Sequence, residues 1–208
     1  MISTIAELQK YIIKGADEFG NIIQKRAFMM TTPGCDQISI NYLKQKISNI
    51  PDSYTNVLRL INVYGVSIGL FNISSYCSRN TDIVDSLLVS NIEDPFFPKK
   101  FMEKHNMIQI GSYNTDLLCL TKGTAHFKEG EILFVEEGYD IYNPQDSQIH
   151  RLSKDFEQFL IVAGNLSQIH GKIHKDNSNL EEKKAEFIYI LKTLGVSEEY
   201  HEAWLSVF

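Results

Sequence analysis

A block of three short apolar segments in the middle of the chain limits what this sequence can fold into. The segments are MIQIG at residues 107–111, DLLCLTK at 116–122 and EGEILFVEE at 129–137, with turn-rich pieces such as GSYNTD between them. Short apolar runs bounded by turn residues predict β-strands. Helical patterns precede and follow this block, so we expect a β-rich centre with helices on both sides.

The clearest helical pattern is IPDSYTNVLRLINVYG, residues 50–65. Pro51 suits the first turn, where its missing N–H costs no hydrogen bond, and Asp52 lies at the positive end of the helix dipole. Gly65 is expected to end the helix in a left-handed conformation. The apolar stripe of this helix, at helical spacing, consists of Tyr54, Val57, Leu58 and Ile61.

Apolar residues at helical spacing also predict helices in the first thirty or so residues, at residues 40–47 and at residues 151–170. Ser153 is the expected N-cap of the third of these helices, with Asp155 in its first turn. The segment EDPFFPKKFMEKH that precedes the strands predicts a short helix or an irregular packed loop.

The last part of the chain begins with a polar link, GKIHKDNSN at residues 171–179. Two further helices are expected after it, the first ending at Gly195 and the second capped by Ser197. An apolar group near the end of the chain is expected to pack on the core; it consists of Tyr200, Trp204, Val207 and Phe208.

Composition excludes several classes of protein. The 208 residues include 20 Lys and Arg against 26 Asp and Glu, a formal net charge of −6. Nucleic acid is therefore not expected as a general partner, because phosphate binding needs clustered cations. No membrane association is expected, because no segment approaches the roughly 20 apolar residues that span a bilayer.

The start of the chain lacks the pattern of a secretory signal, and the three cysteines predict buried free thiols in a reducing compartment. These cysteines, Cys35, Cys77 and Cys119, are odd in number, widely spaced and without a C-x-x-C motif. We therefore expect a cytoplasmic protein.

The stretch Gly65-Val66-Ser67-Ile68-Gly69 fits the G-x-S-x-G spacing of a hydrolase nucleophile elbow. An elbow serine needs a buried strand before it and a helix after it. Here a predicted helix precedes the serine and a strand-like segment follows. The glycines are therefore expected to make a helix-to-strand turn, and Ser67 is expected to have no catalytic role.

Several segments together resemble the SUKH superfamily, which includes the yeast cell-wall synthesis regulator and many bacterial toxin-immunity proteins. IPDSYTNVLRLINVYG is similar to the family's opening helix, MIQIGSYNTDLLCLT to its strand–turn–strand element, GEILFVEEG to the next strand and LSKDFEQFL to its closing helix. The resemblance covers residues 38–166 and depends on the order of elements. Tyr64-Gly65 stands where the family has Asn-Gly after the first helix.

The resemblance implies an α+β fold, with helices packed on a twisted, mainly antiparallel sheet. It also implies three parts of the chain: an N-terminal helical extension at 1–37, a SUKH-like domain at 38–170 and a C-terminal helical extension at 171–208. Family members generally lack a recognised catalytic constellation and bind other proteins. The chain is accordingly expected to have no enzymatic activity and no cofactor.

His170 and His174 lie at i, i+4 and could share a metal ion on a helix, but Gly171 weakens a helix there. The pattern also lacks the Glu of H-E-x-x-H, so no metal site is expected. A solvated helix end, where a cationic His suits the dipole, is the favoured interpretation.

Residues 128–157 carry eight acidic and three basic side chains, a local net charge of −5, with tyrosines among them. In a strand, Glu136 and Glu137 would point to opposite faces, which argues against paired catalytic carboxylates. An acidic surface with tyrosines instead suits a basic protein partner. The predicted partner-binding residues are Glu129, Glu131, Glu136, Glu137, Tyr139, Asp140 and Tyr142.

Three functional hypotheses follow from these patterns. The leading one is a toxin-neutralising immunity protein that covers the basic active site of its partner. The second is a regulatory interaction scaffold without a toxin partner. The third and least favoured is a serine hydrolase built on Ser67.

Overall fold

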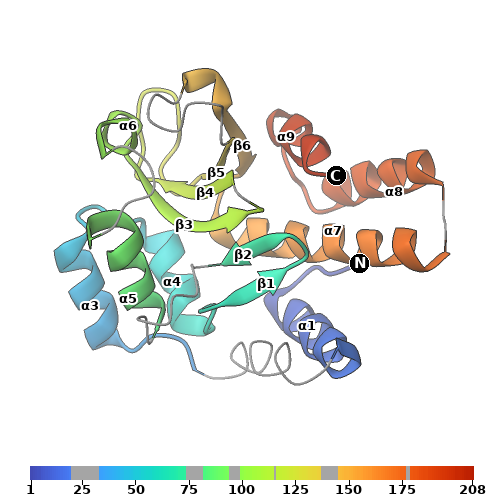
Figure 1. Ribbon diagram of the computed structural model, residues 1–208, viewed down its shortest axis with the longest axis horizontal. Coiled ribbons are helices and arrows are strands. Elements are labelled where there is room, and N and C mark those ends of the chain that lie inside the picture. The colour runs from blue at the N-terminus through green and yellow to red at the C-terminus, as the bar shows by residue number, and fades with distance from the viewer. Residues whose placement is uncertain (20–32, 74–81, 94–98, 115, 137–144, 177–178) are drawn as a thin grey trace.

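The strands form one antiparallel sheet in which each strand pairs with its neighbour in the chain (Figure 1). The computed structural model describes residues 1–19, 33–73, 82–93, 99–114, 116–136, 145–176 and 179–208. The strands are β1 (Val66–Ile68), β2 (Phe71–Ile73), β3 (Met107–Tyr113), β4 (Asp116–Thr121), β5 (Ile132–Val135) and β6 (Ile149–Ser153). The three strands predicted from the middle of the sequence are β3, β4 and β5. The α+β fold class is confirmed.

Helices lie around this sheet at both of its ends (Figure 1). The helices before the central strands are α1 (Ile5–Phe19), α3 (Gln37–Lys46), α4 (Asp52–Leu60), α5 (Ile83–Leu88) with the π-turn η1 (Val89–Glu93), and α6 (Lys99–Lys104). The later ones are η2 (Asp146–Gln148), α7 (Phe156–Asp176), α8 (Leu180–Thr193), η3 (Glu198–Tyr200) and α9 (His201–Ser206). In Figure 1, α3, α4 and α5 gather beside one end of the sheet, and α8 and α9 lie beside the other.

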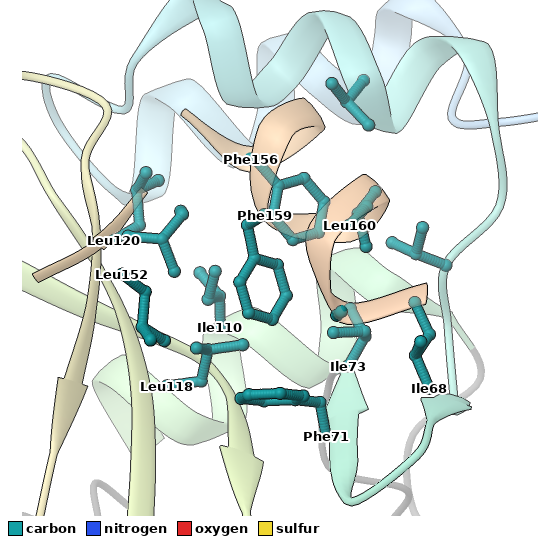
Figure 2. Close-up of a cluster of buried hydrophobic side chains, with 14 of the residues drawn as sticks. Ile68, Phe71, Ile73, Ile110, Leu118, Leu120, Leu152, Phe156, Phe159 and Leu160 are labelled. Carbon is teal, nitrogen blue, oxygen red and sulfur yellow. The ribbon is translucent and has the colours of Figure 1, made fainter. Parts of the chain in front are cut away.

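The two faces of the sheet bury different sets of side chains because successive residues of a strand point in opposite directions. One face packs against α7, whose Phe156, Phe159 and Leu160 lie over the strand side chains (Figure 2). These strand side chains include Phe71, Ile110, Leu118, Leu120 and Leu152. The other face holds a smaller cluster, which consists of Phe101, Met107, Leu117, Cys119, Leu133 and Val135. Both faces are covered, so β5 is a continuous apolar run.

The terminal elements share the main core with the sheet. Ile2 and Leu8 near the start of the chain belong to the same buried cluster as Trp204 and Val207 near its end. The apolar group at residues 200–208 therefore packs on the core, as predicted. Each end of this chain contributes buried side chains to one continuous core.

The predicted polar link at residues 171–179 is wrong over its first part, because α7 continues to Asp176. The boundary expected between residues 170 and 171 therefore falls inside a helix. A Cβ placed on Gly171 would meet nothing within 4 Å, so this glycine is not required by packing. One glycine costs a helix only about 1 kcal/mol, which the packing of α7 outweighs.

Three other local predictions, on where a helix begins, is capped or ends, were wrong. The predicted helix at residues 151–170 begins later, because residues 149–153 form β6 and pair with β5. Asp155, rather than Ser153, caps α7 by accepting a hydrogen bond from the Gln158 N–H at 2.8 Å. Helix α4 ends at Leu60, and Gly65, with φ of 65°, forms the turn that leads into β1.

None of the helices in the described part of the chain combines the length and apolar character needed to cross a membrane.

Candidate functional site

Glu131 is buried, which corrects its prediction as a partner-binding residue. It precedes β5, its side chain is 0% exposed, and it accepts hydrogen bonds from three groups. The Tyr200 hydroxyl donates to Oε1 at 2.7 Å, and the Lys128 backbone N–H donates to Oε2 at 2.9 Å. The third donor is the Arg151 guanidinium, which also binds Oε1. A carboxylate this deep cannot touch a partner protein.

The Glu131 carboxylate belongs to a network that joins the sheet to the C-terminal elements. Arg151 in β6 also binds the Glu199 carboxylate, with Nη1 and Oε2 separated by 2.6 Å. The guanidinium lies over the Tyr200 ring, 5.3 Å from its centroid. Burial first, and then the bond to Glu131, raises the pKa of the Tyr200 hydroxyl. Tyr200 therefore stays neutral and acts as a hydrogen-bond donor to the buried carboxylate.

Two of the predicted acidic residues are exposed on either side of β5. Glu129 lies in the turn before the strand and has no ion-pair partner among the described residues. Glu136 follows the strand, its side chain is 50% exposed, and its Oε1 lies 3.2 Å from His150 Nε2. These two atoms are close enough for an ion pair but are not aligned for a hydrogen bond. Glu129 and Glu136 are thus available to a partner protein.

The remaining predicted partner-binding residues, Glu137, Tyr139, Asp140 and Tyr142, lie outside the described residues. The structure therefore places three of the seven predicted residues, and it brings two of them to the surface.

Asp146, another acid of the same segment, is engaged within the protein. It accepts hydrogen bonds from Lys104 Nζ at 2.7 and 2.8 Å, and its Oδ1 lies 3.0 Å from His105 Nε2. The bond from Lys104 is the main reason that the pKa of the Asp146 carboxyl is lowered, and His105 adds to it. The His105 ring itself packs between Phe101 and Phe127. The contacts of Asp146 therefore join the end of α6 to η2.

The lowered pKa of Asp146 predicts a pH-dependent contribution to stability. A carboxyl whose pKa is lower in the folded state stabilises the fold above its unfolded-state pKa, here near 3.8, and loses that effect as the pH falls through the folded-state value. In urea unfolding, Asp146→Asn is expected to be less stable than the wild type at pH 7. The difference should shrink in acid below pH 3.8. An unchanged difference would contradict the assignment.

Ser67 lies in a β-hairpin, so the G-x-S-x-G spacing has a structural origin. Val66, Ser67 and Ile68 form β1, and Gly69-Leu70 turns the chain into β2. The exposed Ser67 hydroxyl donates to the Asn72 Oδ1 at 2.7 Å across the hairpin. A nucleophile elbow would need a helix directly after the serine, and a strand occupies that place. The expected helix-to-strand turn therefore occurs before Ser67, at Gly65.

Ser67→Ala is expected to change the free energy of unfolding by less than about 0.5 kcal/mol, because the hydroxyl makes one exposed hydrogen bond. Urea unfolding of both proteins measures this. A serine-directed fluorophosphonate is expected to label neither protein at residue 67, as judged by mass spectrometry of the peptides. Labelling of the wild type that disappears in the variant would restore the hydrolase hypothesis.

Only His170 of the histidine pair has a described side chain, and it makes a hydrogen bond within the protein. His170 Nε2 donates to the Phe208 carbonyl at 2.8 Å, which ties α7 to the end of the chain. The His174 side chain lies outside the described residues. No group of three or more metal-ligating side chains occurs among the side chains that the structure describes.

Both described cysteines have a thiol whose pKa is raised by burial. Cys119 is fully buried in the smaller core, and burial raises the pKa of its thiol. Cys35 is half-buried, and burial, followed by the Asp82 and Asp36 carboxylates, raises the pKa of its thiol to about 11. Both are free thiols. Cys77 lies outside the described residues.

Comparison with known proteins identifies no relative: no family model, no curated protein and no solved structure matches the chain.

Proposed function

We propose that this chain is a SUKH-like immunity protein that binds a basic toxin and covers its active site. The proposal rests on the order of sequence elements that resemble the SUKH superfamily, together with the α+β class of the fold. The observation that carries the binding surface is the exposure of Glu129 and Glu136 at the two ends of β5. Residues 137–142, which carry two further acids and both tyrosines of the segment, follow directly in the sequence.

The proposed mechanism is electrostatic attraction followed by steric occlusion. A toxin that cleaves nucleic acid needs a basic groove for phosphate groups, and that groove is complementary to a cluster of carboxylates. Such a field acts over a Debye length of about 8 Å at physiological salt and mainly accelerates encounter. The tyrosines then supply contact area at a small cost in conformational entropy. The bound protein blocks the groove without any chemical step.

Charge reversal tests the proposal. The variant Glu129→Lys/Glu136→Lys should bind a toxin whose gene neighbours that of this protein about tenfold more weakly than the wild type does at 50 mM salt. The difference in affinity should become smaller at high salt. Surface plasmon resonance would show the loss mainly as slower association. Adding Asp140→Lys should weaken binding further.

The matched control reverses two exposed acids on another element, Glu181→Lys/Glu182→Lys at the start of α8. This variant has the same change of charge and should keep at least half of the wild-type association rate. Equal losses in the two variants would indicate a general charge effect and contradict a localised acidic surface. Toxin binding that is indifferent to salt and to all of these variants would remove the electrostatic mechanism.

A further inference from the structure

Among the residues that the structure describes, no strand pairs with the first half of β3 on the side opposite β4, which leaves this edge free of described strands. Strand β2 pairs only with Gly111, Ser112 and Tyr113 of β3. The preceding residues Met107, Ile108 and Gln109 extend beyond the end of β2 and pair on their other side with β4, and the register shifts at Ile110. An unpaired strand edge presents backbone N–H and C=O groups that can bind another strand.

The Asn91 side chain occupies one position of this edge. Its Oδ1 accepts from the Gln109 N–H at 2.7 Å, and its Nδ2 donates to the Gln109 C=O at 2.9 Å. These are the two bonds that a residue of a neighbouring antiparallel strand would make. Asn91 lies in the π-turn η1, and such turns occur frequently at functional sites. The side-chain amide of Asn91 therefore takes the place of a neighbouring strand, but only at Gln109.

The backbone of Met107 faces the same free edge. Opposite it, Thr121 uses both of its backbone groups toward the β5 side: its N–H donates to Glu131 and its C=O accepts from Gly130, each at 3.0 Å. Met107 and Thr121 are therefore a pair without mutual hydrogen bonds. Residues two apart in a strand point their backbone groups to the same side. The N–H and C=O of Met107 therefore point to the same edge as those of Gln109.

A groove with a volume of about 400 Å³ runs along this edge, a size in the range of ligand-binding clefts. Its apolar walls come from both sides of the sheet. Met102, Met107 and Leu117 belong to the smaller core, whereas Ile47 and Ile108 belong to the main core. Ile92 of η1 also lines the groove and is 51% exposed. An added strand would direct alternate side chains toward these two walls.

Lys46 and Lys122 line the groove, and neither forms an ion pair with another described residue. Lys46 Nζ lies 5.5 Å from the centroid of the Tyr42 ring, which leaves the cation at the rim. Glu103 is the one acidic side chain among the described residues that line the groove. The groove therefore favours a ligand that carries a carboxylate.

We propose that this groove binds an extended, acidic peptide segment of a partner protein as a strand added to the edge of β3. The peptide backbone pairs with Met107, its alternate apolar side chains contact Ile92 and Met102, and a carboxylate lies between Lys46 and Lys122. This mode of recognition combines main-chain hydrogen bonds with side-chain pockets on both faces. Neither Glu129 nor Glu136 lines the groove, and the inference does not depend on toxin binding.

The probe is a set of eight-residue peptides enriched from a random phage-displayed library. Phage that bind the Ile92→Arg variant are removed first, and the remainder are selected on the wild-type protein. Enriched peptides are then synthesised with fluorescein, and their dissociation constants are measured by fluorescence anisotropy. We expect peptides with alternating apolar residues and an Asp or Glu. Failure to enrich any peptide after this subtraction would overturn the proposal.

Substitutions in the protein locate the binding. Ile92→Arg should weaken binding about tenfold or more, because it places a charge in the apolar wall. Leu180→Arg is the matched control, since Leu180 is 54% exposed on α8, and it should bind like the wild type. Lys46→Glu/Lys122→Glu should weaken an acidic peptide about tenfold and leave its amide analogue unchanged. Wild-type affinity in Ile92→Arg would contradict the site.

Backbone methylation of the peptide distinguishes an added strand from contacts made by side chains alone. Asn91 occupies the backbone groups of Gln109, so only the peptide residue opposite Met107 bonds to β3 through its N–H. N-methylation at that residue should abolish binding, and N-methylation at the next residue, whose N–H points away from β3, should preserve it. Equal effects at the two positions would overturn strand pairing. Glu136→Lys should leave peptide affinity unchanged, because Glu136 does not line the groove, so failure of this proposal and failure of toxin binding are distinguishable.

Discussion

Trp204→Ala is expected to lower the free energy of unfolding by about 3–5 kcal/mol, the range found for buried tryptophan and phenylalanine residues. The Trp204 side chain is fully buried. Its ring lies 5.7 Å from that of Phe71 and 5.8 Å from that of Phe159, and its Nε1 donates to the Leu152 carbonyl at 2.6 Å. The variant loses apolar burial and aromatic contacts, and it leaves a buried carbonyl without its donor.

Urea unfolding followed by far-UV circular dichroism measures the effect. Tyr189→Ala on α8 is the control, because this aromatic side chain is 69% exposed and its removal should cost less than about 0.5 kcal/mol. Trp204→Phe keeps most of the ring volume and should recover part of the loss. Equal stability of Trp204→Ala and the control would mean that the C-terminal elements do not pack on the sheet as described.

Glu131→Ala is expected to cost about 3 kcal/mol, because it removes the buried carboxylate that accepts from both Arg151 and Tyr200. Arg151 would keep only its contact with Glu199, and the Tyr200 hydroxyl would lose its acceptor. Glu199→Ala is the matched control. The Glu199 side chain is 39% exposed, and its ion pair with Arg151 should contribute no more than about 1 kcal/mol.

A combined replacement separates the electrostatic explanation from a loss of packing. Glu131→Leu/Arg151→Met/Tyr200→Phe removes all three polar partners and should be much closer to the wild type in stability than Glu131→Ala. If the triple variant were as unstable as Glu131→Ala, the shape of Glu131 rather than its charge would account for the loss. Both outcomes are read from the same urea titrations.

The parts of the fold that were predicted are those whose residues carry a strong local pattern. Helix α4 has a proline at its start and a clear apolar stripe, and β5 is apolar throughout because both of its faces are covered. Strand β6 was missed because Ile149, His150 and Arg151 are only partly buried and resemble the start of the helix that follows. Helix α5 was not predicted, since five of its six residues are buried and no amphipathic stripe remains.

The candidate site was harder to predict than the fold, because charge along a sequence does not reveal which charges are paired in space. Glu131 and Asp146 were counted with the surface acids, yet one is buried against Arg151 and the other binds Lys104. Their basic partners lie 20 and 42 residues away in the chain. The groove beside β3 was also not predicted. It depends on which residues of β3 pair with β2, and no local sequence pattern predicts that pairing.

The position of Trp204 against Phe71 and Phe159 also has a consequence for biosynthesis. While the ribosome is still adding the residues after α7, a nascent chain can already contain all six strands but not the indole that covers these rings. Exposed apolar surface of this kind makes folding intermediates prone to aggregation and recruits chaperones. The protein should therefore acquire its full resistance to proteases only after residue 204 has emerged from the exit tunnel.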